Sequence, residues 1–286
     1  MAEAGAIMKV LVSTDIEGVA GVFHPEQTRA GNAEYERARR WMTAEANAAI
    51  EGAFAGGASE VWVNDSHGGF RNLLPDRLDA RARVVLGKPR TLGMMAGLEY
   101  GAALVFMIGY HARAQTGGIL AHTINSGAFA QVRIGGTEAG EAELYGAVAE
   151  QYGARVALLS GDDVFAAQTQ PRFPDARFVV VKQATGQTSG ISDSPERACA
   201  AIRHAAQEAA QEAEQRNADA PCPAPQGRPS PVLCELRTTT PAYADLFCQW
   251  PALERIDAVT LRFEAANAEH TVRMLNCLSA MSFMLR

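Results

Sequence analysis

The sequence predicts an α/β protein whose largely parallel sheet is flanked by helices, followed by a smaller C-terminal α/β part. Two observations lead to this prediction. Short apolar runs rich in β-branched residues alternate with stretches of helical character, and most of these runs end in polar or glycine residues. Buried parallel strands have this apolar character, and a helix usually connects one such strand to the next.

The first strand is expected at Lys9–Thr14 (KVLVST), because its valines alternate around a single leucine and a polar turn follows. Asn32 is placed to cap a helix from Ala33 to Phe54, which a glycine pair then ends. Further strands are expected at Glu60–Asn64, Arg83–Leu86, Ala103–Ile108, Gln131–Ile134, Arg155–Leu159 and Arg177–Val181. Further helices are expected near Leu92–Leu98 and over Glu138–Gln151 and Ser194–Arg216.

Five prolines between Pro221 and Pro231 exclude a helix or a central strand there and indicate a linker. This linker suggests a catalytic metal-binding α/β domain over residues 8–218 and a C-terminal α/β part over residues 219–286. The elements expected in the C-terminal part are strands Val232–Arg237 and Ala258–Glu264 and a helix Asn267–Phe283.

Composition argues against several classes of protein. The 26 basic and 32 acidic residues give a net charge of −6, which argues against nonspecific nucleic-acid binding. The chain has no apolar run of about 18 residues, the length that a membrane-spanning helix needs, so no membrane association is expected. The N-terminus lacks the pattern of a secretory signal, and the five cysteines form no CxxC pair. These features favour a cytoplasmic protein with reduced thiols.

Common catalytic and nucleotide-binding motifs are missing from the chain. It contains neither GxGxxG nor GxxxxGK[ST], which disfavours a nucleotide-binding module. HExxH and GxSxG are missing as well, which argues against a zincin and a nucleophile-elbow hydrolase.

Metal-ligating residue types follow three of the predicted strands. Asp15 and Glu17 come directly after the first strand, with side chains on the same side of an extended chain. His67 follows the second strand, and His111 follows the strand that ends at Ile108. Ligands of open parallel sheets bind beyond the carboxyl ends of the strands, so these four side chains are expected in one crevice. Carboxylate and imidazole together suit zinc or a similar divalent ion.

The order of several motifs resembles that of the DppA-type D-aminopeptidases, a family of binuclear zinc peptidases. The resemblance covers roughly residues 8–216 and is weaker beyond. The matching stretches are SxDxEG at Ser13–Gly18, MTxEAN at Met42–Asn47, VNDSH at Val63–His67, GYHARA at Gly109–Ala114, His122, Gly140-Glu141, SGDD at Ser160–Asp163 and VKQ at Val181–Gln183.

The resemblance implies a role for each matching residue. Asp15 matches a ligand that bridges two zinc ions, and the other matching ligands are Glu17, His67, His111 and Glu141. His122 matches the catalytic histidine of the family. The sequence pattern alone does not select Glu141, because an acidic residue at a helix start also compensates the helix dipole.

The activity implied by the resemblance is hydrolysis of short peptides that begin with a D-amino acid, assisted by two zinc ions. The resemblance also implies a ring-based, self-compartmentalised homo-oligomer, for which a decamer is a candidate size. Two alternatives remain open. A binuclear-metal phosphoesterase would need a cation for phosphate, for which Arg113 is the candidate, and a metal-binding assembly protein would show no turnover.

Overall fold

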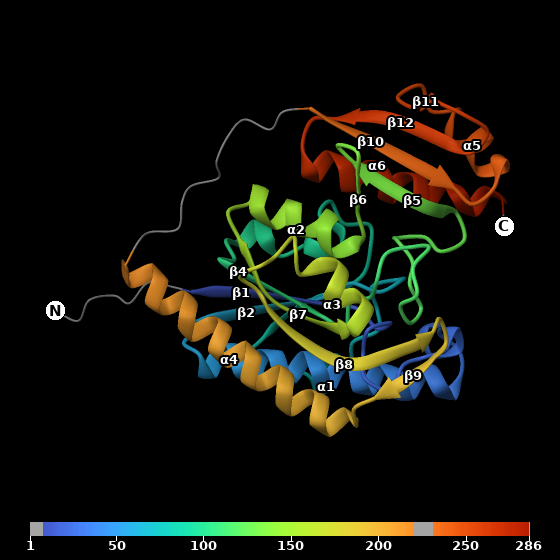
Figure 1. Ribbon diagram of the computed structural model, residues 1–286. Helices are drawn as coiled ribbons and strands as arrows, with labels where there is room; N and C mark the ends of the chain where they lie inside the picture. The colour runs from blue at the N-terminus through green and yellow to red at the C-terminus, as the bar shows by residue number, and fades with distance from the viewer. Residues whose placement is uncertain (1–7, 220–230, 286) are drawn as a thin grey trace.

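A computed structural model describes residues 8–219 and 231–285, which form two sheets with helices packed against them (Figure 1). The larger sheet has the strand order β3-β2-β1-β4-β7-β8-β9, and only β9 runs antiparallel to its neighbour. This architecture confirms the predicted α/β fold with a largely parallel sheet. The strands are β1 (Lys9–Thr14), β2 (Glu60–Asp65), β3 (Arg83–Val85), β4 (Leu104–Ile108), β7 (Arg155–Asp162), β8 (Arg177–Gly186) and β9 (Ser189–Ser192).

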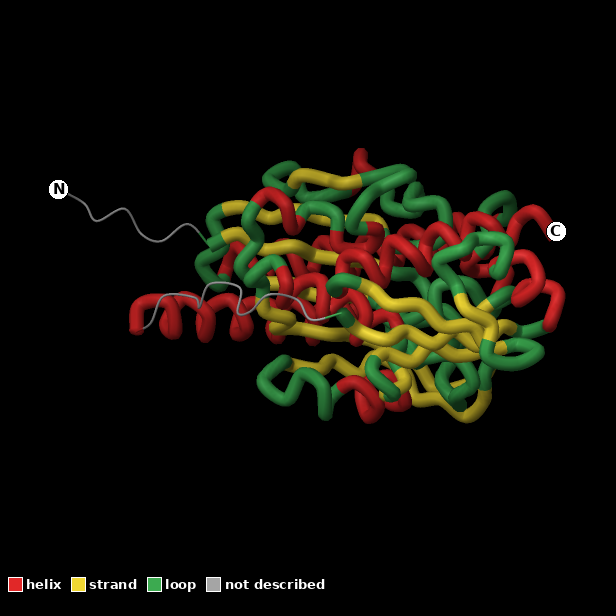
Figure 2. Tube along the Cα trace, turned by 90° about the horizontal axis from the view of Figure 1, so that it is seen from above, coloured by secondary structure: helices red, strands yellow, loops and turns green. Residues whose placement is uncertain are grey.

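Helices α1 (Ala33–Ala55) and α4 (Pro195–Asp219) cover one face of this sheet and lie side by side (Figure 1). Gly52 lets them approach closely, because a Cβ atom there would lie 2.3 Å from the carbonyl oxygen of Arg203. The last turns of α4 extend beyond the strands in both views (Figure 1, Figure 2). Helices α2 (Glu141–Gln151) and α3 (Asp163–Thr169) cover the other face.

The smaller sheet is antiparallel and has the order β11-β12-β10-β5-β6. Strand β5 precedes the proline-rich stretch and pairs with β10, which follows it, with Val132 opposite Leu236. The division at residue 218 stays a prediction, and residues 220–230 of the predicted linker lie outside the described residues. The elements are β5 (Phe129–Ile134), β6 (Thr137–Glu138), β10 (Val232–Thr238), α5 (Pro241–Phe247), β11 (Glu254–Arg255), β12 (Thr260–Ala265) and α6 (Ala268–Met281).

The helix predicted near Leu92–Leu98 is wrong. The chain forms two short 3₁₀ turns there, η3 (Gly93–Met95) and η4 (Leu98–Tyr100), because Gly93 and Gly97 both adopt positive φ angles, of 53° and 116°. The other 3₁₀ turns are η1 (Pro25–Thr28), η2 (Pro75–Arg77) and η5 (Ser282–Leu285). Among residues 8–219 and 231–285, no helix is long and apolar enough to cross a membrane.

Candidate metal centre

The candidate site lies beyond the carboxyl ends of three adjacent strands, in the order β2-β1-β4. Backbone hydrogen bonds continue the sheet into the loops: the N–H of Asp15 donates to the carbonyl of Ile108 at 2.8 Å. The N–H of Ser66 likewise donates to Thr14 at 2.8 Å. The residues that follow the strands are therefore brought together by the sheet itself.

Asp15 lies at the centre of the cluster and is almost fully buried. Its Oδ1 atom lies 3.2 Å from Nδ1 of His67, and its Oδ2 atom lies 3.3 Å from Nε2 of His111. Glu17 is on the first side, with Oε2 2.9 Å from the same His67 nitrogen. Glu141 is on the second side, with Oε1 3.5 Å from Nε2 of His111. The carboxylate of Asp15 thus faces two separate groups of candidate ligands.

A backbone carbonyl fixes the orientation of each of the three histidines in the site. Nε2 of His67 lies 2.9 Å from the carbonyl of Thr28, so this nitrogen is the one that carries the hydrogen. Nδ1 of His111 and Nδ1 of His122 each lie 3.0 Å from a carbonyl, that of Ala112 and that of Leu120 respectively. When a ring is neutral its other nitrogen carries the lone pair, and in all three rings that nitrogen faces the carboxylates. Metal-ligating histidines typically have this arrangement.

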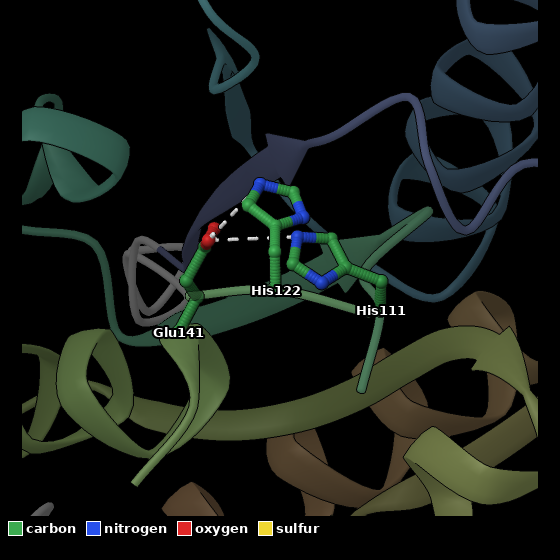
Figure 3. A group of neighbouring side chains, drawn as sticks. All are labelled: His111, His122 and Glu141. Carbon is green, nitrogen blue, oxygen red and sulfur yellow. Dashed lines mark ion pairs between the residues drawn. The ribbon is translucent and has the colours of Figure 1, made fainter. Parts of the chain in front are cut away.

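Figure 3 shows His111, His122 and Glu141 pointing toward one another from three different segments. Glu141 is the first residue of α2, and its Oε1 atom also accepts the N–H of Ile124. Nε2 of His122 lies 3.8 Å from Oε1 of Glu141. The structure therefore brings all six candidate residues, Asp15, Glu17, His67, His111, His122 and Glu141, into one cluster.

The electrostatics of the cluster are those of carboxylates held against imidazoles. Burial opposes ionisation of Asp15, but its close contacts with the imidazoles of His111 and His67 outweigh burial and hold its pKa well below the usual range. The same contacts raise the pKa values of both histidines, against the effect of burial. The pKa of Glu141 is lowered for the same reason, with His111 as the main partner that outweighs burial. The buried carboxylates thus favour a positive charge between them.

Two buried atoms in the cluster have no hydrogen-bond partner among the described residues, Oε2 of Glu17 and Nε2 of His111. Buried polar atoms are normally hydrogen-bonded, and these two atom types are zinc ligands. Their surroundings provide two groups of three ligand atoms within 4.8 Å of one another, Asp15–Glu17–His111 and His111–His122–Glu141. The donor set therefore fits divalent metal ions.

Two other residues considered from the sequence have structural contacts. Asp162, in the SGDD stretch, caps α3 by accepting the N–H of Phe165, and its second oxygen accepts the N–H of Ile119. Arg113 forms an ion pair with Glu138 at 3.0 Å. The cation that a phosphoesterase would need is therefore paired with a carboxylate of the protein.

A cavity of about 330 Å³ borders His67 and is also lined by Tyr35, Arg39 and Arg71. A second cavity, of about 880 Å³, lies between α2, α3 and the smaller sheet, and none of the six candidate residues lines it. Of these two cavities, the one beside His67 borders the cluster.

Sequence reasoning did not assign a role to Glu45 or Lys182, two buried charged residues that contact the loop after β1. A signal for Glu45 exists, because it lies on the same face of α1 as the apolar residues Met42 and Ala49. Lys182 follows the run of three valines in β8, which is a comparable signal.

Comparison with known proteins gives three matches. The family model of the D-aminopeptidases matches residues 8–277. A D-aminopeptidase from Bacillus subtilis (strain 168) is 34% identical over 191 residues, which are 67% of this chain and 69% of the relative. The solved structure of the Zn-dependent D-aminopeptidase DppA from Bacillus subtilis, a self-compartmentalizing protease, matches with a TM-score of 0.88 and 27% identity, over 96% of this chain and 98% of that one.

Proposed function

The chain belongs to the D-aminopeptidase family, and from this premise we propose that it is a zinc-dependent aminopeptidase acting on short peptides with an N-terminal D-amino acid. One observation carries the proposal: the Asp15 carboxylate lies between two groups of buried carboxylates and imidazoles. That donor set suits zinc, and the related structure is of a Zn-dependent enzyme.

We assign two zinc ions to each chain, with Asp15 as the shared ligand. Glu17 and His67 would hold one ion, because their atoms gather at Oδ1 of Asp15. His111 and Glu141 would hold the other, at Oδ2. Bound zinc supplies Lewis acidity toward the scissile carbonyl and makes water nucleophilic near neutral pH.

His122 is the proposed general acid–base residue. Its Nδ1 hydrogen is donated to the carbonyl of Leu120, so Nε2 is left free to accept a proton from the attacking water. Its side chain is 18% exposed, whereas that of His111 is 1% exposed, so His122 is the more accessible of the two. The same Nε2 would then donate the proton to the leaving amine.

Assembly is the second part of the proposal. The related enzyme is self-compartmentalizing, and we propose that this chain forms a ring-based homo-oligomer, with a decamer as the candidate size. Exposed apolar residues at the C-terminal end, Phe283, Met284 and Leu285, offer surface that association would bury. A cytoplasmic location and the division into two α/β parts at residue 218 remain part of this proposal.

The test combines metal analysis with a stereochemical pair of substrates. Purified protein should contain two zinc ions per chain and hydrolyse D-Ala-D-Ala much faster than L-Ala-L-Ala. p-Nitrophenyl phosphate serves as the control for phosphoesterase activity and should not be hydrolysed. Protein without zinc, or zinc-loaded protein inactive on both dipeptides, would overturn the proposal.

A further inference from the structure

Lys182 is a buried lysine that lies outside the proposed ligand set. It belongs to β8 and is 2% exposed, and its Nζ atom donates to the carbonyl of Glu17 at 2.6 Å and to that of Val22 at 2.7 Å. A buried ammonium group is costly unless it is hydrogen-bonded, so these two bonds account for its presence there. They tie together the two ends of the segment Glu17–Val22, which we call the Glu17 loop.

Neighbouring elements hold two further backbone groups of the Glu17 loop. The N–H of Ala20 donates to Oε1 of Glu45 in α1 at 2.9 Å, and the N–H of Gly21 donates to Oγ of Ser192 in β9 at 2.8 Å. Because the contacts come from α1, β8 and β9, the loop is fixed from several sides (Figure 1).

The contact at Glu17 links Lys182 to the candidate metal centre. Nζ holds the carbonyl of Glu17, while the side chain of the same residue points Oε2 at Nδ1 of His67, 2.9 Å away. A shift of this carbonyl would move the Glu17 carboxylate relative to Asp15. Lys182 also carries a positive charge near the carboxylates of Glu45, Glu17 and Asp15, which reduces repulsion among them.

We propose that Lys182 is a positioning residue of the zinc site, which fixes the Glu17 loop and thereby the place of the Glu17 carboxylate. This inference depends on the zinc-dependent function proposed above. It assigns Lys182 no contact with substrate. Residues that orient metal ligands typically change metal affinity by about 10- to 100-fold when they are replaced.

The variant that tests it is Lys182→Met, which keeps much of the side-chain volume and removes the ammonium group. Zinc affinity, measured by competition with a chelator, should fall by about 10- to 100-fold. The visible absorption of Co²⁺-loaded protein should also change, because it reports the geometry of the ligands. Lys182→Gln can still donate to a carbonyl, so its zinc affinity should lie between those of wild type and Lys182→Met.

The matched control is Ile202→Ala, which removes a fully buried apolar side chain of α4 but none of the hydrogen bonds that hold the Glu17 loop. It should lower the melting temperature while leaving zinc affinity and the cobalt spectrum unchanged. If neither Lys182 variant folds, Ser192→Ala should still weaken zinc binding, because it removes the acceptor for the N–H of Gly21 along with the bond that Ser192 donates to the carbonyl of Asp193.

The outcomes distinguish failure of the proposed function from failure of the positioning role of Lys182. Wild-type protein that binds no zinc would overturn the proposed function. If wild type binds zinc and Lys182→Met binds it as tightly as Ile202→Ala does, the positioning role alone is overturned. If neither Lys182 variant folds, an unchanged zinc affinity of Ser192→Ala would likewise overturn the positioning role.

Discussion

The imidazole rings of His111 and His122 stack with centroids 4.1 Å apart and planes inclined by 10° (Figure 3). Their Nε2 atoms face the same oxygen of Glu141, at 3.5 Å and 3.8 Å. The two rings differ in surroundings, because His111 also faces Asp15 and is enclosed, whereas His122 is partly exposed. The stack therefore holds an enclosed ligand candidate against a more accessible histidine.

His122→Ala should keep its zinc and its fold and lose turnover. General acid–base groups contribute about 10²- to 10⁴-fold in rate, so kcat should fall by that factor with a smaller change in KM. Metal analysis and steady-state kinetics on the same preparation give the answer. Near-wild-type kcat would contradict the catalytic role, and loss of zinc in proportion to activity would make His122 a ligand.

Parallel-strand topology explains why part of the site was predictable. Asp15, His67 and His111 lie within three residues of the ends of strands that are neighbours in the sheet, so their convergence needs only the order β2-β1-β4. His122 and Glu141 were selected by resemblance alone. Their approach to the other site residues depends on tertiary contacts, such as the hydrogen bond from the N–H of Leu120 to the carbonyl of Gln187. No local sequence pattern predicts such contacts.

The fold, like the site, was predictable from the sequence only in part. The apolar strands of the larger sheet were predictable because burial on both faces gives continuous apolar runs. Strand β9 is polar and glycine-containing (SGIS), and it forms only by pairing with β8. Strand β5 was predicted at Gln131–Ile134, but its place in the second sheet depends on pairing with β10, about a hundred residues later.

Asp15→Ala should abolish binding of both proposed zinc ions. Each of its carboxylate oxygens faces a different histidine, so its removal takes one ligand from each proposed ion. Zinc content per chain checks this, with Glu17→Ala as the comparison, because Glu17 is a proposed ligand of the ion on the His67 side alone. Asp15→Ala protein that keeps one ion at full affinity would contradict the bridging role.

The proposed assembly predicts a mass far above that of a single chain of 30.5 kDa. Size-exclusion chromatography with light scattering should give a large homo-oligomer, and Met284→Glu should shift the population toward smaller species because it places a charge on an exposed apolar residue. A monomeric wild-type protein with full activity would contradict the compartment.

The buried carboxyl group of Glu45 should make the stability of the protein depend on pH, even when no metal is bound. Burial raises the pKa of Glu45 to about 7 from an ordinary value of 4.5, although the hydrogen bond from Ala20 and the charge of Lys182 oppose the increase. The folded protein therefore holds this proton more tightly than the unfolded chain. The resulting stabilisation is complete below pH 4.5 and is lost as pH rises from 4.5 to 7.

Glu45→Gln isolates this effect, because glutamine keeps an oxygen for the N–H of Ala20 and does not titrate. The free energy of unfolding of wild type should fall relative to Glu45→Gln between pH 4.5 and 7.5, by up to about 3 kcal/mol. Denaturant unfolding of both zinc-free proteins, at equal protomer concentration, measures this difference, and titration of the site histidines cancels between them. A difference between the two proteins that stays constant with pH would show that Glu45 has an ordinary pKa in the folded state.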